Sequence, residues 1–303
     1  MSLCSVNESI RETSDNCWVI GGKILLTRAE SPLCSPSWSD GKGSFYNISE
    51  AASPVPPSRP LSTESCIRKV YEAGGASAVW VVGDAICKVK VLDPHSTREH
   101  TTLQYLHDKQ HLSFPVPKVY YHTEHDNRYY IIQSRLSGET LSSVWSTADD
   151  VTKQQYVTRV VDICQELAIW RADNVCGVDG KHLSDLYLTR RLSNDCSPTT
   201  LLRNCKELEM DCSEFLFYHC DLGPGNIIVN TTDGTLGLID WETAGFVPRE
   251  WIRTKFRVSG GLDLPGHDHD SRGDWRRRVQ RHLEKEGFPD IAETWMTWWK
   301  NEM

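Results

Sequence analysis

A short polar segment between apolar runs constrains the fold of this chain more than any other feature. It reads His219-Cys220-Asp221-Leu222-Gly223-Pro224-Gly225-Asn226, and a second acid, Asp240, ends the apolar stretch that follows. Between Asn226 and Asp240, apolar runs at residues 227–229 and 236–239 flank an Asp-Gly pair, a pattern that predicts a β-hairpin. Because a hairpin returns the chain to its starting end, we expect Asn226 and Asp240 to lie close together.

Asp221, Asn226 and Asp240 are residue types that phosphoryl transfer requires. A carboxylate accepts or orients the proton of the attacking group, and oxygen ligands hold Mg²⁺ against nucleotide phosphates. An Asp and an Asn five residues apart on a loop, followed by a second Asp at a strand end, have the spacing of this chemistry. Polar groups on Gly-Pro loops also cap turns, but capping does not require the joint spacing. His219 is predicted to be a structural hydrogen-bonding residue, because Asp221 already handles the proton.

Strands are predicted to precede helices along the chain. Apolar runs bounded by turn residues predict strands at residues 18–26 (two, around a Gly-Gly turn), 79–82, 85–91, 118–121, 129–133 and 215–218. After Thr147, Val157, Val160, Cys164 and Leu167 recur at helical spacing, and the chain is again helical from residue 274 onward. The predicted fold class is α+β, with a small β-rich lobe before a larger, mainly helical lobe.

Three segments follow from these patterns. Residues 1–66 are predicted to form an N-terminal extension with short strands and a Ser/Pro-rich tether, because Ser and Pro are frequent in residues 31–63. Residues 67–137 are predicted to form a nucleotide-binding N-lobe, and residues 138–303 a C-lobe with the catalytic loop, the metal site and the acceptor site. The strand pair and tether of the extension are expected to pack on the small lobe.

Composition and charge exclude several classes of protein. A formal net charge of -8 argues against a nucleic-acid binder, which carries a basic face for phosphates. No apolar stretch approaches the length of a membrane span, and the first residues lack the basic and apolar regions of a signal peptide. Eleven cysteines occur without a Cys-x-x-Cys pair and are expected to be reduced thiols. A cytoplasmic location follows, and neither a membrane nor a nucleic acid is an expected partner.

On these motifs the chain resembles the aminoglycoside phosphotransferase family within the protein-kinase-like fold, and most closely its divergent fungal members. Family members carry a His-x-Asp-x-x-x-x-Asn loop, matched by His219, Asp221 and Asn226, and a following metal Asp, matched by Asp240. The resemblance extends from about residue 67 to at least residue 251. It implies a bilobal kinase-like fold, Asp221 as the catalytic base, Asn226 and Asp240 as Mg²⁺ ligands, and ATP or GTP as the nucleotide. Cys220 departs from the small or polar residue usual at its position.

The resemblance also implies a strand lysine that meets the nucleotide phosphates and pairs with a helix glutamate. Lys88 lies in a predicted strand, eleven residues before Glu99, and is the preferred candidate. Lys90 lies on the same face of that strand and stays open as the alternative. Glu99 shares a helix face with apolar residues, where an unpaired carboxylate would be unfavourable, so a partner for it is expected.

Further nucleotide contacts follow from the resemblance alone. Ser77, in the glycine-containing loop at residues 74–79, is expected over the phosphates, although the loop lacks a full Gly-x-Gly-x-x-Gly. Gln133 would be the gatekeeper, and backbone groups of Ser134 and Leu136 would meet the adenine.

The sequence therefore predicts an ATP-dependent small-molecule kinase that phosphorylates a hydroxyl or an amine of a metabolite. The alternative is a kinase-fold protein without phosphotransfer, which would be a binding module or an enzyme for another reaction in the same cleft. A protein kinase is disfavoured, because the chain runs from Asp240 to Pro248 without an Ala-Pro-Glu motif or room for an activation segment. No oligomeric state is predicted.

Overall fold

The computed structural model describes residues 5–33, 35–109 and 111–300, so the outermost residues of the predicted extension and C-lobe lie outside it. The chain divides into two compact units, of which the first combines Met1–Pro94 with Pro117–Arg135 and the second combines His95–Val116 with Leu136–Met303. The first unit is built from β-sheets and the second mainly from helices, which confirms the predicted α+β class. The division into three segments stays a prediction.

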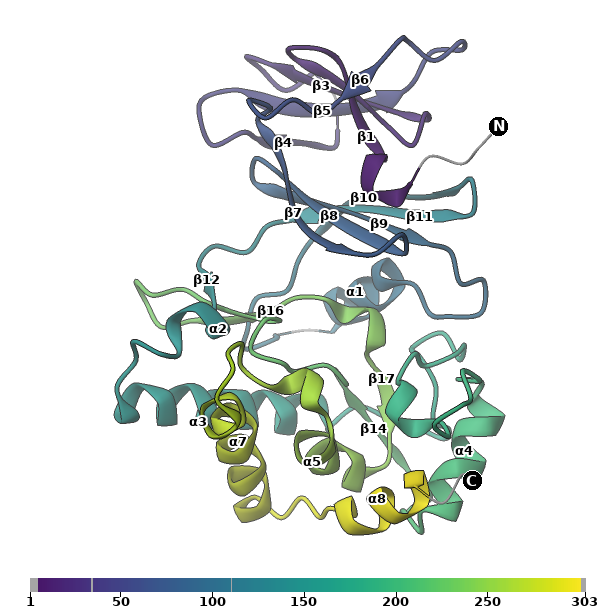
Figure 1. Cartoon of the computed structure of the whole chain (residues 1–303), viewed down its shortest axis with the longest axis vertical. Helices are drawn as coiled ribbons and strands as arrows, with labels where there is room; N and C mark the ends of the chain where they lie inside the picture. Colours follow the sequence, from purple (N-terminus) through teal and green to yellow (C-terminus); the bar gives the residue numbers. More distant parts are fainter. Residues whose placement is uncertain (1–4, 34, 110, 301–303) are drawn as a thin grey trace. The chain divides into compact units, whose positions relative to one another are not determined.

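Two antiparallel sheets make up the first unit (Figure 1). One has six strands in the order β4-β5-β3-β2-β1-β6, and the other has five in the order β10-β11-β9-β8-β7. The elements are η1 Val6–Glu8, β1 Ile10–Ser14, β2 Cys17–Ile20, β3 Ile24–Ala29, β4 Ser37–Ser39, β5 Phe45–Glu50, β6 Arg59–Pro60, β7 Ile67–Ala73, β8 Ser77–Val82, β9 Ala85–Val91, β10 Val119–His125 and β11 Arg128–Ser134.

A single hydrophobic core joins these two sheets. Trp18 and Tyr46 enter it from the six-stranded sheet, and Trp80 and Tyr130 enter it from the five-stranded sheet. On β8 and β9 the core residues alternate with residues of the opposite face, as the two-residue period of a strand requires. The extension therefore packs on the small-lobe sheet, as expected for its strand pair.

The prediction that residues 31–63 form an irregular tether is wrong, because β4, β5 and β6 lie within this range. Trp38 and Tyr46 are buried, and their rings stack with centroids 5.8 Å apart. Trp38 also stacks on Tyr120 of the small-lobe sheet, at 5.4 Å. Burial of these aromatic rings stabilises strands within a stretch whose Ser and Pro content is typical of loops.

Gly83, in the turn between β8 and β9, lies directly against the backbone of Ser39 and Asp40 in the extension. Its φ is 60°, and a Cβ atom there would lie 2.5 Å from the Ser39 carbonyl oxygen. We expect Gly83→Ala to lower the free energy of unfolding by about 2–3 kcal/mol, measured by urea denaturation. Gly234→Ala is the matched control, since its φ of 74° is similar but nothing lies within 4 Å. A loss no larger than the control's would contradict this contact.

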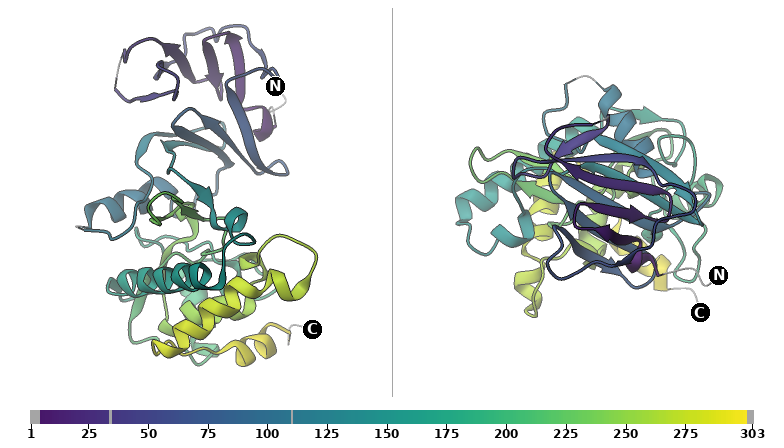
Figure 2. Two further views of the ribbon diagram at one scale, coloured as in Figure 1. Left: turned by 90° about the vertical axis from the view of Figure 1, so that its left-hand side faces the viewer. Right: turned by 90° about the horizontal axis from the view of Figure 1, so that it is seen from above.

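The second unit combines helices with two small sheets, ordered β12-β15-β16 and β13-β14-β17. Figure 2 shows α3 and α7 side by side, and α7 also packs on α5. The elements are α1 Glu99–Asp108, β12 Glu139–Thr140, α2 Leu141–Val144, α3 Asp150–Leu167, β13 Arg171–Ala172, η2 Leu186–Leu188, α4 Pro198–Glu207, β14 Phe215–Tyr218, β15 Ile227–Val229, β16 Leu236–Leu238, η3 Trp241–Thr243, β17 Gly245–Val247, α5 Arg249–Val258, η4 Gly260–Leu262, α6 His269–Arg272, α7 Asp274–Lys285 and α8 Ala292–Lys300.

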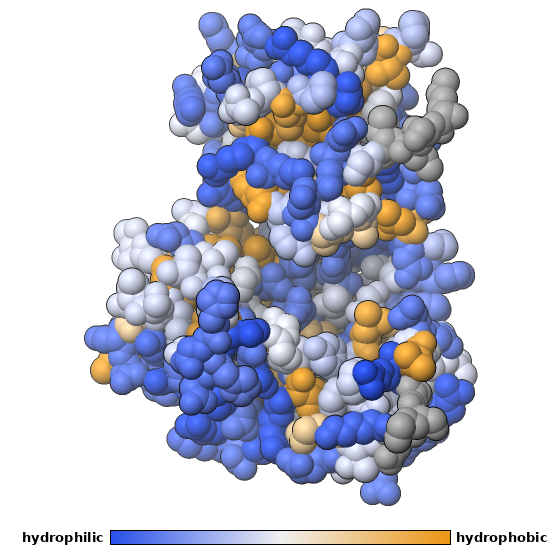
Figure 3. Space-filling view, in the orientation of Figure 1, coloured by the Kyte–Doolittle hydropathy of each residue, from blue (hydrophilic) through white to orange (hydrophobic). Residues whose placement is uncertain are grey.

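Polar residues dominate the visible surface. The face drawn in Figure 3 is mostly hydrophilic, with apolar residues in small groups. Within the described residues, no helix is both long and apolar enough to cross a bilayer. The nine cysteines of the described ranges are all free thiols, as expected.

Candidate active site

The polar loop lies between β14 and β15, and buried strands on both sides hold its ends. His219 is fully buried at the start of the loop, and its two ring nitrogens contact backbone. Nε2 lies 2.9 Å from the Ile239 carbonyl oxygen, and Nδ1 accepts a hydrogen bond from the Asp221 N–H at 3.2 Å. These contacts require a neutral ring with its proton on Nε2. Burial lowers the pKa of His219, which also favours the neutral ring. His219 therefore orients the loop.

Asp221 and Asn226 are in direct contact. The Asn226 Nδ2 atom donates to the Asp221 Oδ2 atom and to the Asp221 carbonyl oxygen, both at 2.9 Å. Burial raises the pKa of the Asp221 carboxyl group, and the nearby Asp240 carboxylate adds to this, whereas Lys255 and the hydrogen bond from Asn226 act in the opposite direction. A carboxylate with a raised pKa is a stronger proton acceptor than an ordinary one.

The predicted hairpin brings Asp240 to the loop. The Ile239 N–H donates to the Asn226 carbonyl oxygen at 3.0 Å, which joins the end of β16 to the start of β15. Asp240 itself has φ 66° and ψ 58°, a left-handed conformation that few residues other than Gly, Asn and Asp adopt. Cys220 also has a positive φ, 64°. Positive φ at two non-glycine residues beside the loop is typical of functional sites.

Several neighbours fix the backbone of the loop. The Trp275 indole N–H donates to the Leu222 carbonyl oxygen at 3.3 Å, and the Ser142 N–H donates to the Pro224 carbonyl oxygen at 3.0 Å. Thr243 donates its hydroxyl to the His219 carbonyl oxygen at 3.2 Å. Three separate elements thus hold the loop that carries Asp221, which limits its motion without contacting the carboxylate.

A cluster of three carboxylates lies at the end of the hairpin. Glu99, Asp240 and Glu242 each place one carboxylate oxygen within 4.8 Å of the others, and the Trp241 N–H donates to Glu99 Oε1 at 3.3 Å. Oxygen ligands this close fit a hard divalent cation. Glu242 was not among the predicted ligands, although its position two residues after Asp240 in a tight 3-10 turn is the signal that identifies it. Glu99 is buried, as its helix face predicted.

The predicted lysine lies on the small-lobe face that points away from the extension. Ala85, Cys87 and Val89 of β9 enter the shared core, so Lys88 and Lys90 lie on the opposite face. In the sheet Lys88 pairs with Val79 and Ile131, and Lys90 pairs with Ser77 and Tyr129. Lys88 is 6% exposed, which favours it over the half-buried Lys90 as the residue of an enclosed site.

The other residues predicted to contact the nucleotide lie on β8, on β11 and just after β11. The hydroxyl of Ser77 is buried and forms no hydrogen bond among the described residues. The N–H of Ser134 donates to the Lys118 carbonyl oxygen at 2.8 Å, so this N–H is already paired within the sheet. Gln133 is buried on β11, and Leu136 opens the second unit, with its side chain against Gly237.

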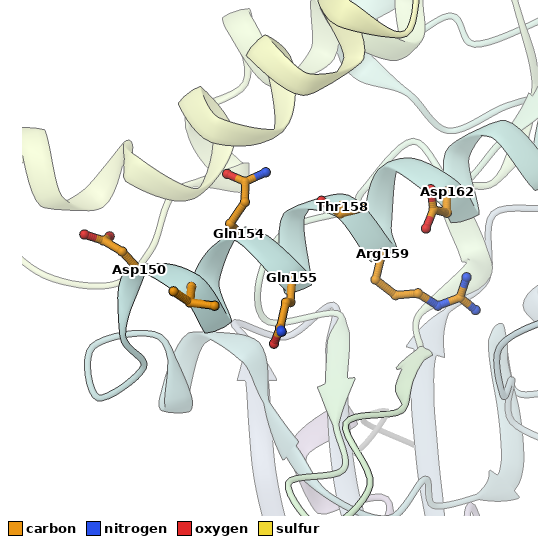
Figure 4. Close-up of a pocket in the computed structure, with 7 residues that line it drawn as sticks. Asp150, Gln154, Gln155, Thr158, Arg159 and Asp162 are labelled. Carbon is orange, nitrogen blue, oxygen red and sulfur yellow. The ribbon is translucent and has the colours of Figure 1, made fainter.

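A surface pocket of about 570 Å³ does not coincide with these residues. Figure 4 shows that side chains of α3, from Asp150 to Asp162, line it. All lining residues come from one helix, and none is a predicted site residue. The pocket is a surface hollow of the second unit and plays no part in the candidate site.

The chain belongs to the phosphotransferase enzyme family (APH), whose model matches residues 71–251, more than half of the 303 residues. The matched region contains the loop, the hairpin, Asp240, Lys88 and Glu99, whereas the first 66 residues lie outside it. The family predicted from the His-x-Asp-x-x-x-x-Asn loop is thereby confirmed. No curated protein sequence matches the chain significantly.

Solved structures of aminoglycoside phosphotransferases are similar to this chain. Aminoglycoside phosphotransferase APH(4)-Ia is 14% identical with a TM-score of 0.50, and the alignment covers 73% of this chain and 77% of that one. A thermostable mutant of the same enzyme, in ternary complex with AMP-PNP and hygromycin B, is 17% identical with a TM-score of 0.49, over 76% and 82% of the two chains. At 14% identity the likeness to the first of these structures shows the fold alone, which is the predicted protein-kinase-like fold.

Proposed function

We propose that the chain transfers the γ-phosphoryl group of ATP, or of GTP, to a hydroxyl or an amine of a small-molecule metabolite. The main support for this proposal is the 2.9 Å hydrogen bond between the side chains of Asn226 and Asp221. The hairpin also places Asp240 next to this pair, because the Ile239 N–H donates to the Asn226 carbonyl oxygen. The family supports a phosphotransferase in general, since its model matches the region that contains these residues.

Asp221 is the proposed base, which accepts the proton of the attacking hydroxyl or amine. Asn226 orients Asp221 through its amide nitrogen, and its amide oxygen makes none of the hydrogen bonds found among the described residues. That oxygen and the Asp240 carboxylate are the proposed Mg²⁺ ligands, with Glu99 and Glu242 beside Asp240. Magnesium bound there would neutralise charge on the nucleotide phosphates.

The proposed nucleotide contacts lie on the small-lobe face that carries Lys88. Lys88 would meet the phosphates as a cation, and the Ser77 hydroxyl, unpartnered among the described residues, supplies a donor to an oxygen. The Ser134 carbonyl and the Leu136 backbone are the proposed adenine contacts. Glu99 is the proposed partner that positions the lysine.

The acceptor is proposed to lie beside the catalytic loop, against the helical part of the second unit. Gly223 is one boundary of that region, because a Cβ atom there would lie 3.3 Å from the Gly261 carbonyl oxygen. The segment after α5 therefore borders the loop that carries Asp221. We also propose that the protein acts in the cytoplasm, on the basis of its cysteine usage.

An acceptor screen tests this function. The full chain is incubated with γ-labelled ATP, Mg²⁺ and pools of small molecules that carry hydroxyl or amine groups, with EDTA as the control. We expect label in a low-molecular-mass product from at least one pool, and none with EDTA. Saturable ATP binding without labelled product from any pool would instead favour the alternative, a kinase-fold binding module.

A further inference from the structure

The N-terminal extension contacts the small-lobe sheet near both ends of strand β8. At one end the Trp38 indole N–H donates to the Val82 carbonyl oxygen at 2.7 Å, and the Asp84 N–H donates to the Ser39 carbonyl oxygen at 3.0 Å. At the other end the Asn7 Nδ2 atom donates to the Gly74 carbonyl oxygen at 3.1 Å. Since the family match begins at residue 71, these contacts join a segment outside the family region to the β7–β8 and β8–β9 turns inside it.

Asn7 is held in place for its contact with Gly74. It lies in η1, a 3-10 turn that packs against β8 and β9, and Val6 of this turn is buried in the core shared by the two sheets. The Asn7 N–H donates to the Ser5 hydroxyl oxygen at 3.3 Å, which caps the turn. The burial of Val6 and the cap from Ser5 therefore fix the turn from which the Asn7 side chain contacts Gly74.

The contact with Gly74 also determines where the next N–H group points. In a trans peptide the carbonyl and the following N–H point in opposite directions. With the Gly74 carbonyl directed at Asn7 on the extension side, the Gly75 N–H is directed away from the extension. That is the side of the sheet on which Lys88 lies, because the core residues of β9 point toward the extension. Gly74 has φ 53°, a left-handed conformation that glycine adopts without steric cost.

We propose that Asn7 is a positioning residue that holds the Gly74–Gly75 turn with its N–H group presented to the nucleotide phosphates. This inference rests on the proposed function and deepens it, because it assigns the extension a part in nucleotide binding. Backbone N–H groups of glycine-containing turns bind phosphate oxygens, and a turn that is already ordered loses less entropy on binding. Asn7 acts through Gly74 and does not itself touch the nucleotide.

Two variants of the full chain test this role. Asn7→Ala removes the donor, and Asn7→Asp keeps the size of the side chain but places a carboxylate, which cannot donate, beside the Gly74 carbonyl. We expect each variant to raise the Kd of Mg·ATP about fivefold, the effect of one lost hydrogen bond, without raising the KM of the acceptor. Asn16→Ala is the matched control, because Asn16 is exposed in the β1–β2 turn of the same sheet.

Hydrogen exchange without nucleotide separates this inference from the proposed function. We expect the amides of residues 74–77 to exchange faster in both Asn7 variants than in the wild type and in the Asn16→Ala control, with the amides of β9 unchanged. Unchanged exchange in residues 74–77 would overturn the inference, and so would faster exchange with an unaltered Kd. Faster exchange in a protein whose wild type binds no Mg·ATP would overturn the proposed function and the nucleotide role of the turn, while the anchoring by Asn7 would stand.

Discussion

Replacing Asp221 by Asn is expected to lower turnover by about 10²–10⁴-fold, the usual contribution of a general base, while the Kd of Mg·ATP stays within about threefold. Asparagine has nearly the shape of aspartate, and its side-chain oxygen can still accept the hydrogen bond that Asn226 donates at 2.9 Å. The loop geometry is therefore kept, and only the capacity to accept a proton is lost. Initial rates with an acceptor found by the screen, together with calorimetric titration of Mg·ATP, measure the two effects.

Asp233→Asn provides the matched control for this experiment. Asp233 lies in the turn between β15 and β16, where it is exposed and accepts a hydrogen bond from the Thr235 N–H at 2.9 Å. The same change of side chain, twelve residues from Asp221, is expected to leave turnover unchanged within about twofold. Undiminished turnover in Asp221→Asn would show that Asp221 is not the base.

The largest effect on stability is expected from Lys255→Met. Lys255 forms an ion pair with Asp185, and the side chains are only 6% and 0% exposed. Asp185 also accepts hydrogen bonds from the Trp251 indole N–H at 2.8 Å and from the Tyr187 N–H at 3.1 Å. Removal of the lysine leaves a buried carboxylate without its cation, so the free energy of unfolding should fall by about 3–5 kcal/mol in urea denaturation.

Lys181→Met is the control for this prediction, because Lys181 pairs with Asp179 at 3.3 Å but has a side chain that is 54% exposed. Its loss should lower the free energy of unfolding by less than about 1 kcal/mol. The double variant Asp185→Asn with Lys255→Met should recover part of the loss, since it leaves no buried charge. A Lys255→Met variant as stable as the control would contradict a buried ion pair at this position.

Local patterns in the sequence predicted the frame of the site. The apolar runs after Asn226 became β15 and β16 at nearly the predicted bounds, and β9 and β14 have the predicted bounds. These elements are short and bounded by turn residues, so neighbouring residues determine them. The alternation on β9 likewise placed Lys88 and Lys90 on one face, while their burial became evident only in the folded sheet.

Features that depend on distant residues were not predictable in the same way. Trp38 and Tyr46 form strands because they stack on each other and join a core supplied largely by other elements, and this overrides a loop-like composition. Glu242 joins Glu99 and Asp240 only because α1 and η3 meet, although α1 precedes η3 by more than a hundred residues. The contact between Asn7 and Gly74 spans 67 residues and leaves no pattern in the sequence.

Calorimetric titration of Mg·ATP into the wild type and into Asp240→Asn tests whether the protein has a metal-dependent nucleotide site. Asparagine tolerates the left-handed backbone of Asp240, at φ 66°, so the variant changes the ligand charge and keeps the fold. We expect saturable binding that requires Mg²⁺ and that weakens at least about tenfold in the variant. No binding of ATP or GTP by the wild type, or equal binding with and without Asp240, would contradict a metal-dependent nucleotide site.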